Sequence, residues 1–283
     1  MKNIITYTQS TLETFDQRPF SSVDSLVLAS ASYIHFPREL KELESFQGIR
    51  LQELYRAEYF DEMFANIPLF AEDTKNLFFA MAASPRFRDI RVKAYTEQYD
   101  LVNEKQFSAV TFQISPQLCY IAFRGTDSTL IGWKEDFNMA FQAPIPSQEE
   151  ALRYIEKAAI YCSGKFYAGG HSKGGNLAVY ASAMCRENVQ TRIERVFSHD
   201  GPGFLESTLQ STEFTNISER VEKTLPQSSI IGMLLEHQES FQIIKSNKTG
   251  LLQHNQFSWF VEDHDFVYIE KLTKEAKYAD RTL

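Results

Sequence analysis

The sequence has none of the long apolar runs that mark membrane-spanning proteins. No stretch reaches the roughly 18 apolar residues of a membrane-crossing helix, so we expect no integral membrane segment. The first residues, MKNIITYTQSTLETFD, mix polar and acidic side chains and lack the apolar core of a signal peptide. Three cysteines, Cys119, Cys162 and Cys185, form no C-x-x-C motif. Their odd number predicts buried free thiols and, with the missing signal peptide, a cytoplasmic protein.

The sequence also lacks the side-chain clusters and loops that hold metals, nucleotides or nucleic acids. Acidic residues outnumber basic ones, 37 to 29, and the formal net charge is −8. Without a basic run, this charge argues against binding to nucleic acid or to an anionic membrane. No H-E-x-x-H motif, Cys/His ligand cluster or glycine-rich phosphate fingerprint occurs. We therefore expect neither a metal nor another cofactor.

The amino acids that are present suffice for a large folded core. The chain has 283 residues, of which 43% are hydrophobic and 13% aromatic. This length suits one α/β domain with an extension. We expect a helical N-terminal region over 1–85 that packs on a core over 86–283, the two forming one structural unit.

The hydrophobic pattern alternates between two periods. Helical spacing predicts helices over 20–36, 51–60, 73–83, 148–162, 173–186 and 266–274. In the first of these, Ser21 and Asp24 have capping-box spacing. Apolar or alternating runs rich in β-branched and aromatic residues predict strands over 90–97, 107–114, 118–123, 165–168, 193–199 and 241–246. This succession predicts an α/β fold with helices on both faces of a mostly parallel sheet.

The most informative stretch is FYAGGHSKGGNLAVYASA at 166–183, which holds a G-x-S-x-G pentapeptide around Ser172. It follows a short apolar run and opens a stretch rich in small residues. A nucleophile elbow needs this context: a strand, a sharp turn that exposes the serine hydroxyl, and a helix. Glycines flank the serine because the turn is strained and leaves no room for larger side chains. The start of the helix supplies backbone N–H groups where an oxyanion would form.

A second motif lies upstream of the elbow. Phe123-Arg124-Gly125-Thr126, followed by Ser128, Trp133 and Asp136, resembles a segment of the class 3 lipases in the α/β-hydrolase superfamily. Those lipases continue with a GHSxGG elbow, to which residues 170–175 of this chain are similar.

The chain resembles a bacterial family of lipase-like hydrolases still more closely. The similar segments are the helix around Asp24, HDGPGF at 199–204, LPQSS at 225–229 and the Gln-His pair at 253–254. The resemblance therefore covers most of residues 20–265. It implies an α/β-hydrolase fold and serine chemistry on carboxylic esters, and it leaves the substrate open.

Ser172 is the candidate nucleophile, and it needs a base to accept its proton. The resemblance implies an oxyanion hole made of the Lys173 backbone N–H and of Thr126, through its backbone N–H and its hydroxyl. Such donors must be preorganised around the developing charge. Arg124 and Asp136 are expected to hold this loop in place and to take no part in the chemistry.

The base is expected to be a histidine late in the chain, because the triad order of this fold is serine, acid, histidine. His254, in GLLQHNQFSW, fits this order and the late Gln-His pair of the resembling family. The other histidines precede the nucleophile, adjoin Asp200, or lie in a helix, a loop or an acidic surface. These are His35, His171, His199, His237 and His264.

The acid is the least determined member of the triad. Class 3 lipases usually carry an Asp-x-x-Pro element after a later strand, whereas this chain reads VEKTLP at 221–226, with no aspartate. Asp200 follows the strand after the elbow helix, a position that some lipases use for their acid. We therefore expect Asp200 to orient His254. Glu222 and Glu236 are the alternatives.

Together these residues predict a serine hydrolase of the lipase or esterase type, which acts on a small acyl ester or a lipid through an acyl-enzyme. Two alternatives stay open: a catalytically degenerate hydrolase that serves as a binding or regulatory module, and a thioesterase or peptidase on the same fold. The segment 127–147, with Trp133, Met139 and Phe141, is expected to be either a lid or a packed loop. Acyl-chain length and oligomeric state are not readable from the sequence.

Overall fold

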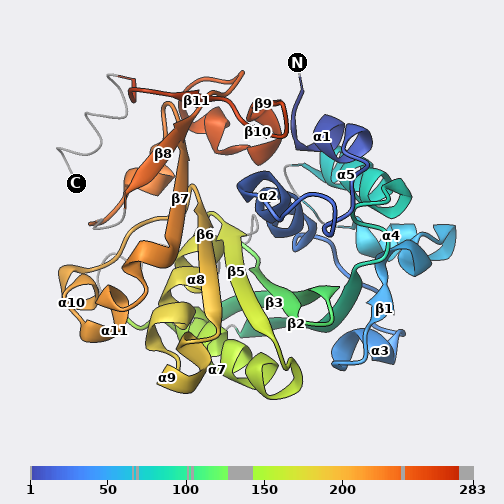
Figure 1. The fold of residues 1–283 in the computed structure, drawn as a ribbon, viewed down its shortest axis with the longest axis horizontal. Helices are drawn as coiled ribbons and strands as arrows, with labels where there is room; N and C mark the ends of the chain where they lie inside the picture. The colour runs from blue at the N-terminus through green and yellow to red at the C-terminus, as the bar shows by residue number, and fades with distance from the viewer. Residues whose placement is uncertain are drawn as a thin grey trace.

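A central nine-stranded sheet dominates the part of the chain that the structure describes (Figure 1). The computed structural model describes residues 2–65, 67, 70–100, 102, 105–126, 143–236 and 240–273. In order across the sheet, the strands are β1 (Ile49–Arg50), β2 (Arg91–Asp100), β3 (Lys105–Ser115), β4 (Leu118–Phe123), β5 (Lys165–His171), β6 (Ile193–His199), β7 (Val221–Pro226), β8 (Phe241–Ile244) and β11 (Tyr268–Ile269). A separate pair is formed by β9 (Val261–Glu262) and β10 (Asp265–Phe266).

The strands at the centre of the sheet are parallel. Neighbouring strands from β4 to β8 run in the same direction, while β1 to β4 and β8 with β11 pair antiparallel. The carboxyl ends of the parallel strands meet at one edge, where open α/β sheets form their ligand sites. The predicted mostly parallel sheet is confirmed for its centre, and antiparallel strands extend it on both sides.

The helices differ widely in length. The longer ones are α1 (Ile4–Ser10), α2 (Ser22–Ala31), α5 (Ala71–Ala83), α7 (Pro146–Tyr161) and α8 (Lys173–Met184). Single turns of α-helix are α3 (Lys41–Glu44), α4 (Phe60–Met63), α9 (Glu187–Gln190), α10 (Glu206–Leu209) and α11 (Thr212–Thr215). The 3₁₀ turns are η1 (Leu51–Leu54), η2 (Ala57–Tyr59), η3 (Ser218–Arg220), η4 (Ile231–Met233), η5 (Gly250–His254) and η6 (Gln256–Ser258).

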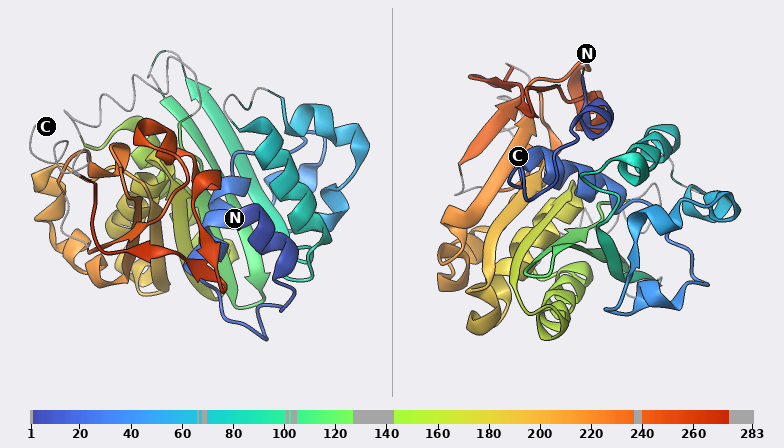
Figure 2. Two further views of the ribbon diagram at one scale, coloured as in Figure 1. Left: turned by 90° about the horizontal axis from the view of Figure 1, so that it is seen from above. Right: turned by 45° about the vertical axis from the view of Figure 1, so that its right-hand side comes forward.

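Helices cover both faces of the sheet, as predicted (Figures 1 and 2). On one face α2 packs against β4 and β5, and α1 and α5 pack against α2. On the other face α7 and α8 pack against each other and against β3 to β6. Strand β4 shows why: Tyr120 and Ala122 join the core with α2, while Ile121 and Phe123 join the core with α7 and α8. Successive side chains of a strand point to opposite faces, so β4 contributes to both cores.

The first predicted helix is α2, and its N-terminus is capped as expected. The Ser21 side chain accepts a hydrogen bond from the Asp24 backbone N–H, and the Asp24 carboxylate accepts one from the Ser21 N–H. The helix ends at Ala31, before residue 36, because the chain leaves the helical path there. The His35 N–H donates to the Met63 carbonyl instead of to a carbonyl of α2.

Two predicted helices are wrong. Residues 51–60 form the 3₁₀ turns η1 and η2 and the start of α4, in which the N–H groups of Tyr55 and Tyr59 donate to carbonyls only three residues back. The expected closing helix over 266–274 is also absent from its described part, 266–273. Phe266 belongs to β10, and β11 adds to the edge of the sheet beside β8.

Strand β7 was not predicted, because Glu222 and Lys223 interrupt its apolar pattern and parallel strands are usually apolar on both faces. In the structure the Glu222 carboxylate is compensated. It pairs with Arg195 of β6 at 2.5 Å, and it accepts a hydrogen bond from the Ser22 hydroxyl at 2.9 Å. A charged residue therefore fits this strand because a basic partner lies on the neighbouring one.

Three other expectations concern the chain as a whole. Among the described residues, no helix combines the length and the apolar character needed to span a bilayer. Cys119, Cys162 and Cys185 are buried and unpaired, which confirms the prediction of free thiols. The division of the chain at residue 85 stays a prediction.

Candidate active site

Ser172 lies in a strained turn between β5 and α8. Its φ of 59° and ψ of −135° are rare for a residue with a side chain. Two backbone hydrogen bonds hold the turn: the Ser172 N–H donates to the His199 carbonyl, and the Gly175 N–H donates to the Ser172 carbonyl, both at 2.9 Å. This is the strand–turn–helix arrangement that the G-x-S-x-G motif predicts.

Two glycines allow the end of β4 to approach this turn. A Cβ atom at Gly174 would lie 2.1 Å from the Phe123 carbonyl oxygen, so only glycine fits there. A Cβ atom at Gly125 would lie 2.6 Å from the His171 carbonyl oxygen and 3.1 Å from the Ser172 Cβ. The loop that leads to Thr126 therefore contacts the serine turn directly. The Lys173 N–H is at the first position of α8, where backbone N–H groups have no partner within the helix.

The side chains of His254 and Asp200 are within hydrogen-bond distance although they are 54 residues apart in the sequence. His254, at the end of η5, places its Nδ1 2.7 Å from Oδ2 of Asp200. The Asp200 side chain is 1% exposed and that of His254 is 27% exposed, so the acid is buried and the histidine reaches the surface. Asp200 follows β6, and its φ of 50° is a second left-handed torsion at this site.

The other carboxylate oxygen of Asp200 is held by two donors. Its Oδ1 accepts hydrogen bonds from the Ser229 hydroxyl at 2.5 Å and from the Gly232 N–H at 3.2 Å. Two donors on one oxygen fix the plane of the carboxylate. Ser229 belongs to the LPQSS segment at 225–229, which is part of the family resemblance and whose function the sequence did not indicate.

His171 connects the serine turn with the loop of His254. Its Nε2 donates to the His254 carbonyl oxygen at 2.8 Å, so its Nδ1 accepts the hydrogen bond from the Tyr33 hydroxyl at 3.2 Å. The two imidazole rings lie 4.5 Å apart between centroids. Burial, and then the nearby His254, lower the pKa of His171 well below 6.5, which keeps the ring neutral. His171 was set aside in the sequence analysis because it precedes the nucleophile.

A second buried histidine, His199, directly precedes Asp200 at the end of β6. His199 is fully buried, with Nε2 2.9 Å from the Ser25 hydroxyl and Nδ1 2.8 Å from the Thr224 hydroxyl. Burial lowers the pKa of His199 to about 3, so this ring is also neutral. Its partners come from α2 and β7, and they connect the end of β6 with both elements.

Arg124 holds the loop before Thr126, as expected. Its guanidinium forms a buried ion pair with Glu97 of β2. His35 Nδ1 lies 3.1 Å from the same carboxylate, and the Tyr95 hydroxyl donates to it at 3.0 Å. Despite burial, the hydrogen bond from His35 and the charge of Arg124 lower the pKa of Glu97 far below its usual range. The Lys173 side chain also has a structural position, because its Nζ donates to the Gln106 carbonyl at 3.0 Å.

The alternatives for the acid and the base lie elsewhere. Glu222 is paired with Arg195, Glu236 is exposed, and His264 Nδ1 lies 3.1 Å from the Thr11 hydroxyl. The Ser172 hydroxyl makes no hydrogen bond to any described residue, and such bonds often form only when substrate binds. Several residues singled out in the sequence lie outside the described residues: Ser128, Trp133, Asp136, Met139, Phe141 and His237.

The fold of this chain is similar to those of solved lipase structures. The nonglycosylated LIP2 lipase of Yarrowia lipolytica is 13% identical, with a TM-score of 0.50 over 87% of this chain and 94% of that chain. A fungal lipase–inhibitor complex is 14% identical, with a TM-score of 0.49 over 79% of this chain and 78% of that chain. No curated protein matches the chain in sequence. At these identities the likeness shows the fold, and it confirms the predicted α/β-hydrolase fold.

A protein-family model also matches the chain. The family described as Mbeg1-like matches residues 81–283, well over half of the chain. This range contains the serine turn, Asp200 and His254. The predicted lipase-like family is thereby confirmed, and the chain belongs to the Mbeg1-like family.

Proposed function

We propose that the protein is a serine hydrolase that cleaves carboxylic esters with Ser172 as nucleophile, His254 as base and Asp200 as acid. The observation that carries this proposal is the 2.7 Å contact between His254 Nδ1 and Asp200 Oδ2, on a loop bonded to His171, which directly precedes the serine of the strained elbow. This contact supports Asp200 over Glu222 and Glu236. The lipase-like fold of the family is consistent with ester hydrolysis.

The proposed triad implies one tautomer of His254. Because the Asp200 carboxylate can only accept, Nδ1 carries the proton in this contact and Nε2 of the neutral ring is left to act as acceptor. The buried carboxylate also stabilises the imidazolium that forms when His254 takes a second proton. The hydrogen bond from His171 to the His254 backbone carbonyl fixes the loop on which this ring is mounted.

The reaction then proceeds in two halves. His254 Nε2 takes the proton of Ser172 as the serine oxygen attacks the ester carbonyl, and the oxyanion accepts hydrogen bonds from the Lys173 N–H and from Thr126. The imidazolium returns this proton to the leaving alkoxide, which departs as an alcohol and leaves an acyl-serine. Water, deprotonated by the same histidine, attacks the acyl-serine, and the carboxylic acid and free Ser172 are released.

We propose a cytoplasmic location for the protein. The three free and buried thiols are typical of reducing compartments. The bacterial origin that the sequence resemblance implies stays a prediction, as does the function of 127–147 as a lid.

Two alternatives remain distinguishable by experiment. The absence of a hydrogen bond between the Ser172 hydroxyl and any described residue is the observation that favours a degenerate binding module. A thioesterase or peptidase would use the same site with another acyl donor. The acyl donor therefore has to be measured, since the fold does not determine it.

A panel of acyl donors tests the proposal. The wild-type protein is assayed with p-nitrophenyl acetate, butanoate and octanoate, an acyl thioester and a chromogenic peptide. We expect ester hydrolysis that Ser172→Ala lowers by about 10⁴-fold or more, whereas Ser207→Ala, at an exposed serine, leaves it unchanged. A folded wild type that hydrolyses none of the esters would contradict the proposal, and faster thioester or peptide turnover would replace the substrate class.

A further inference from the structure

A cavity of about 500 Å³ lies between β2, β3, α7 and the segment around α3. Its volume falls in the range of small-molecule sites. Neither Ser172 nor His254 lines it, so it is a different hollow from the candidate active site.

A distortion of β2 accompanies this cavity. The register between β2 and β3 shifts between Lys93 and Thr96, and Ala94 has a φ of 49°. The bent backbone is held in place from both sides. The Ala94 N–H donates to the Ser45 carbonyl at 2.8 Å, and the Tyr154 hydroxyl donates to the Ala94 carbonyl at 3.0 Å. Strained residues that the surroundings hold in this way concentrate at functional sites.

The cavity has an apolar side. Leu43, Phe107 and Tyr154 line it and are almost completely buried, and the half-buried Phe46 lies beside them. Aromatic and aliphatic side chains of this kind bind the apolar part of a ligand.

The charged residues of the lining leave an unpaired cation. Each carboxylate already has a basic partner: Glu97 pairs with Arg124, Glu150 Oε1 lies 3.0 Å from Lys105 Nζ, and Glu44 Oε1 lies 3.4 Å from Lys41 Nζ. Lys157 has no ion-pair or hydrogen-bond partner among the residues that the structure describes. Among the charged residues of the lining, the exposed Lys157 is therefore the one whose charge no described residue balances.

We propose that this cavity binds a single-chain amphiphile with an anionic head group, with the chain on the apolar side and the head group paired with Lys157. A fatty-acid carboxylate and an alkyl phosphate share this chemistry. The inference goes beyond the proposed hydrolase function and does not depend on it, because the cavity and the serine turn are separate.

Binding is measured by calorimetry on the full chain with Ser172→Ala, so that turnover plays no part. We expect decanoate to bind, and decyltrimethylammonium and butanoate to bind at least about tenfold more weakly, because one lacks the negative head group and the other most of the apolar chain. Decyl phosphate is titrated in the same way, and whichever of decanoate and decyl phosphate binds more tightly identifies the head group as a carboxylate or a phosphate. Equal binding of decanoate and decyltrimethylammonium would overturn the proposal.

Two further substitutions locate the site. In the same background, Lys157→Glu should weaken decanoate binding by about tenfold, whereas Lys165→Glu, an exposed lysine outside the cavity, should not. Thr96→Trp, at a half-buried strand position in the lining, should fill the cavity and abolish binding. Decanoate affinity that neither substitution lowers would place the ligand elsewhere and contradict the inference. If Thr96→Trp does not fold, the decanoate affinities of Lys157→Glu and Lys165→Glu still show whether the ligand binds in this cavity.

Discussion

Two residues of the candidate site have left-handed backbone torsions, Ser172 with a φ of 59° and Asp200 with a φ of 50°. Neither is glycine, so each conformation costs of order 1–3 kcal/mol that the surrounding structure must offset. At Ser172 the turn connects the end of β5 with the start of α8. At Asp200 it brings the carboxylate to His254, with Ser229 and Gly232 on the other oxygen.

The first prediction concerns the hydrogen bond between Asp200 and His254. Asp200→Asn keeps the shape of the side chain but can offer an N–H to Nδ1, which favours the wrong tautomer of the imidazole. We expect kcat for ester hydrolysis to fall by about 10⁴-fold, with the fold retained. The measurement is steady-state kinetics on p-nitrophenyl butanoate.

Ser229→Ala is the matched control for this prediction. It removes one donor to Asp200 and leaves the Gly232 N–H in place, so its effect on kcat should be much smaller. An Asp200→Asn enzyme as active as the Ser229→Ala enzyme would show that Asp200 does not orient the base.

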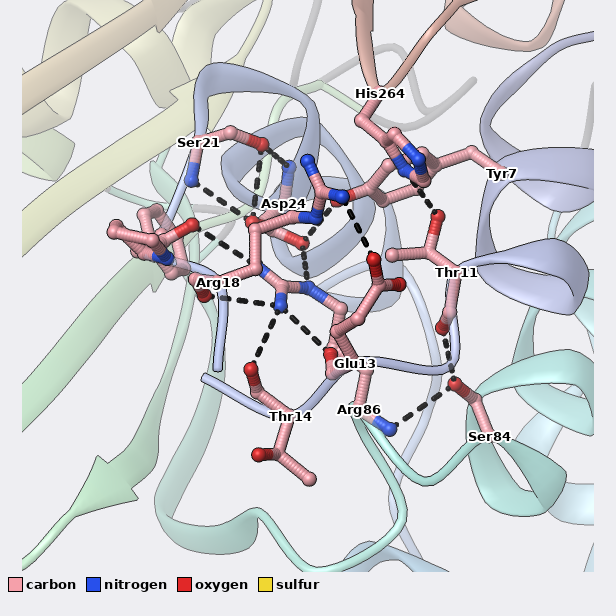
Figure 3. A network of polar contacts seen from close by, with 12 residues as sticks. Tyr7, Thr11, Glu13, Thr14, Arg18, Ser21, Asp24, Ser84, Arg86 and His264 are labelled. Carbon is pink, nitrogen blue, oxygen red and sulfur yellow. Dashed lines mark hydrogen bonds and ion pairs between the residues drawn. The ribbon is translucent and has the colours of Figure 1, made fainter. Parts of the chain in front are cut away.

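At the scale of elements, a buried ion pair holds the first turn of α2 in place. Asp24 in its first turn binds Arg86 through two bonds, Nε to Oδ1 at 2.8 Å and Nη2 to Oδ2 at 2.6 Å (Figure 3). Both side chains are 0% exposed, and the Tyr7 hydroxyl donates to the same carboxylate at 2.8 Å. Arg86 also donates to the carbonyls of Glu13 and Pro19. One guanidinium thus fastens α2 and the segment between α1 and α2 to the residues that follow α5, and Tyr7 of α1 joins the same carboxylate.

This arrangement predicts a large loss of stability from either single substitution. Asp24→Asn leaves the Arg86 charge buried without its partner, and it should lower the free energy of unfolding by about 3–5 kcal/mol. Arg86→Lys should also be destabilising, because lysine cannot form the two-pronged bond. The measurement is urea unfolding. Glu149→Gln, which breaks an exposed pair with Arg153, is the control and should change stability far less. A loss of stability in Asp24→Asn no larger than that in Glu149→Gln would contradict a stabilising role of the Asp24–Arg86 pair.

How well the elements could be predicted depends on where their hydrogen bonds go. Strands β4 and β6 have the predicted bounds because each is enriched in β-branched and aromatic residues and pairs on both sides. Strand β5 was predicted to end at Ala168 but reaches His171, since pairing with β4 and β6 carries it through two glycines that are poor strand formers. The segment 51–60 has helical spacing, but it forms 3₁₀ turns, and the N–H groups of Leu51 and Gln52 donate to the carbonyls of Ile90 and Arg88. No local pattern records such contacts.

The same limit applies to the site. The G-x-S-x-G and Arg-Gly-Thr motifs are local, so the strained serine turn and the adjoining loop could be predicted from them. The roles of Tyr33, His171 and Glu97 could not, because their partners are 138, 83 and 27 residues away in the sequence. Asp200 was chosen among three acids on position alone, and its contact with His254 appears only in the fold.

For the whole molecule, two buried neutral histidines link stability to pH. Burial lowers the pKa of His199 to about 3 and that of His171 well below 6.5. In the unfolded chain both take up a proton near pH 6.5, whereas the folded protein excludes it. The stabilisation is therefore complete above pH 6.5 and is lost progressively as the pH falls below that value.

We accordingly expect the free energy of unfolding to decrease between pH 6.5 and 5, by up to about 1.4 kcal/mol per pH unit for each histidine. His199→Gln should reduce this slope by the contribution of one histidine, whatever its effect on stability at neutral pH. Urea unfolding at a series of pH values measures both slopes. Identical slopes for the wild type and the variant would contradict the assignment of His199 as a buried neutral ring.

Labelling with a fluorophosphonate probe tests whether His254 and Asp200 activate Ser172. We expect the wild-type protein to be labelled at Ser172, Ser172→Ala to abolish the label, and His254→Ala and Asp200→Asn to slow labelling strongly. Peptide mass mapping locates the modified residue. A well-folded wild type that is not labelled, or a label that survives in Ser172→Ala, would contradict the claim.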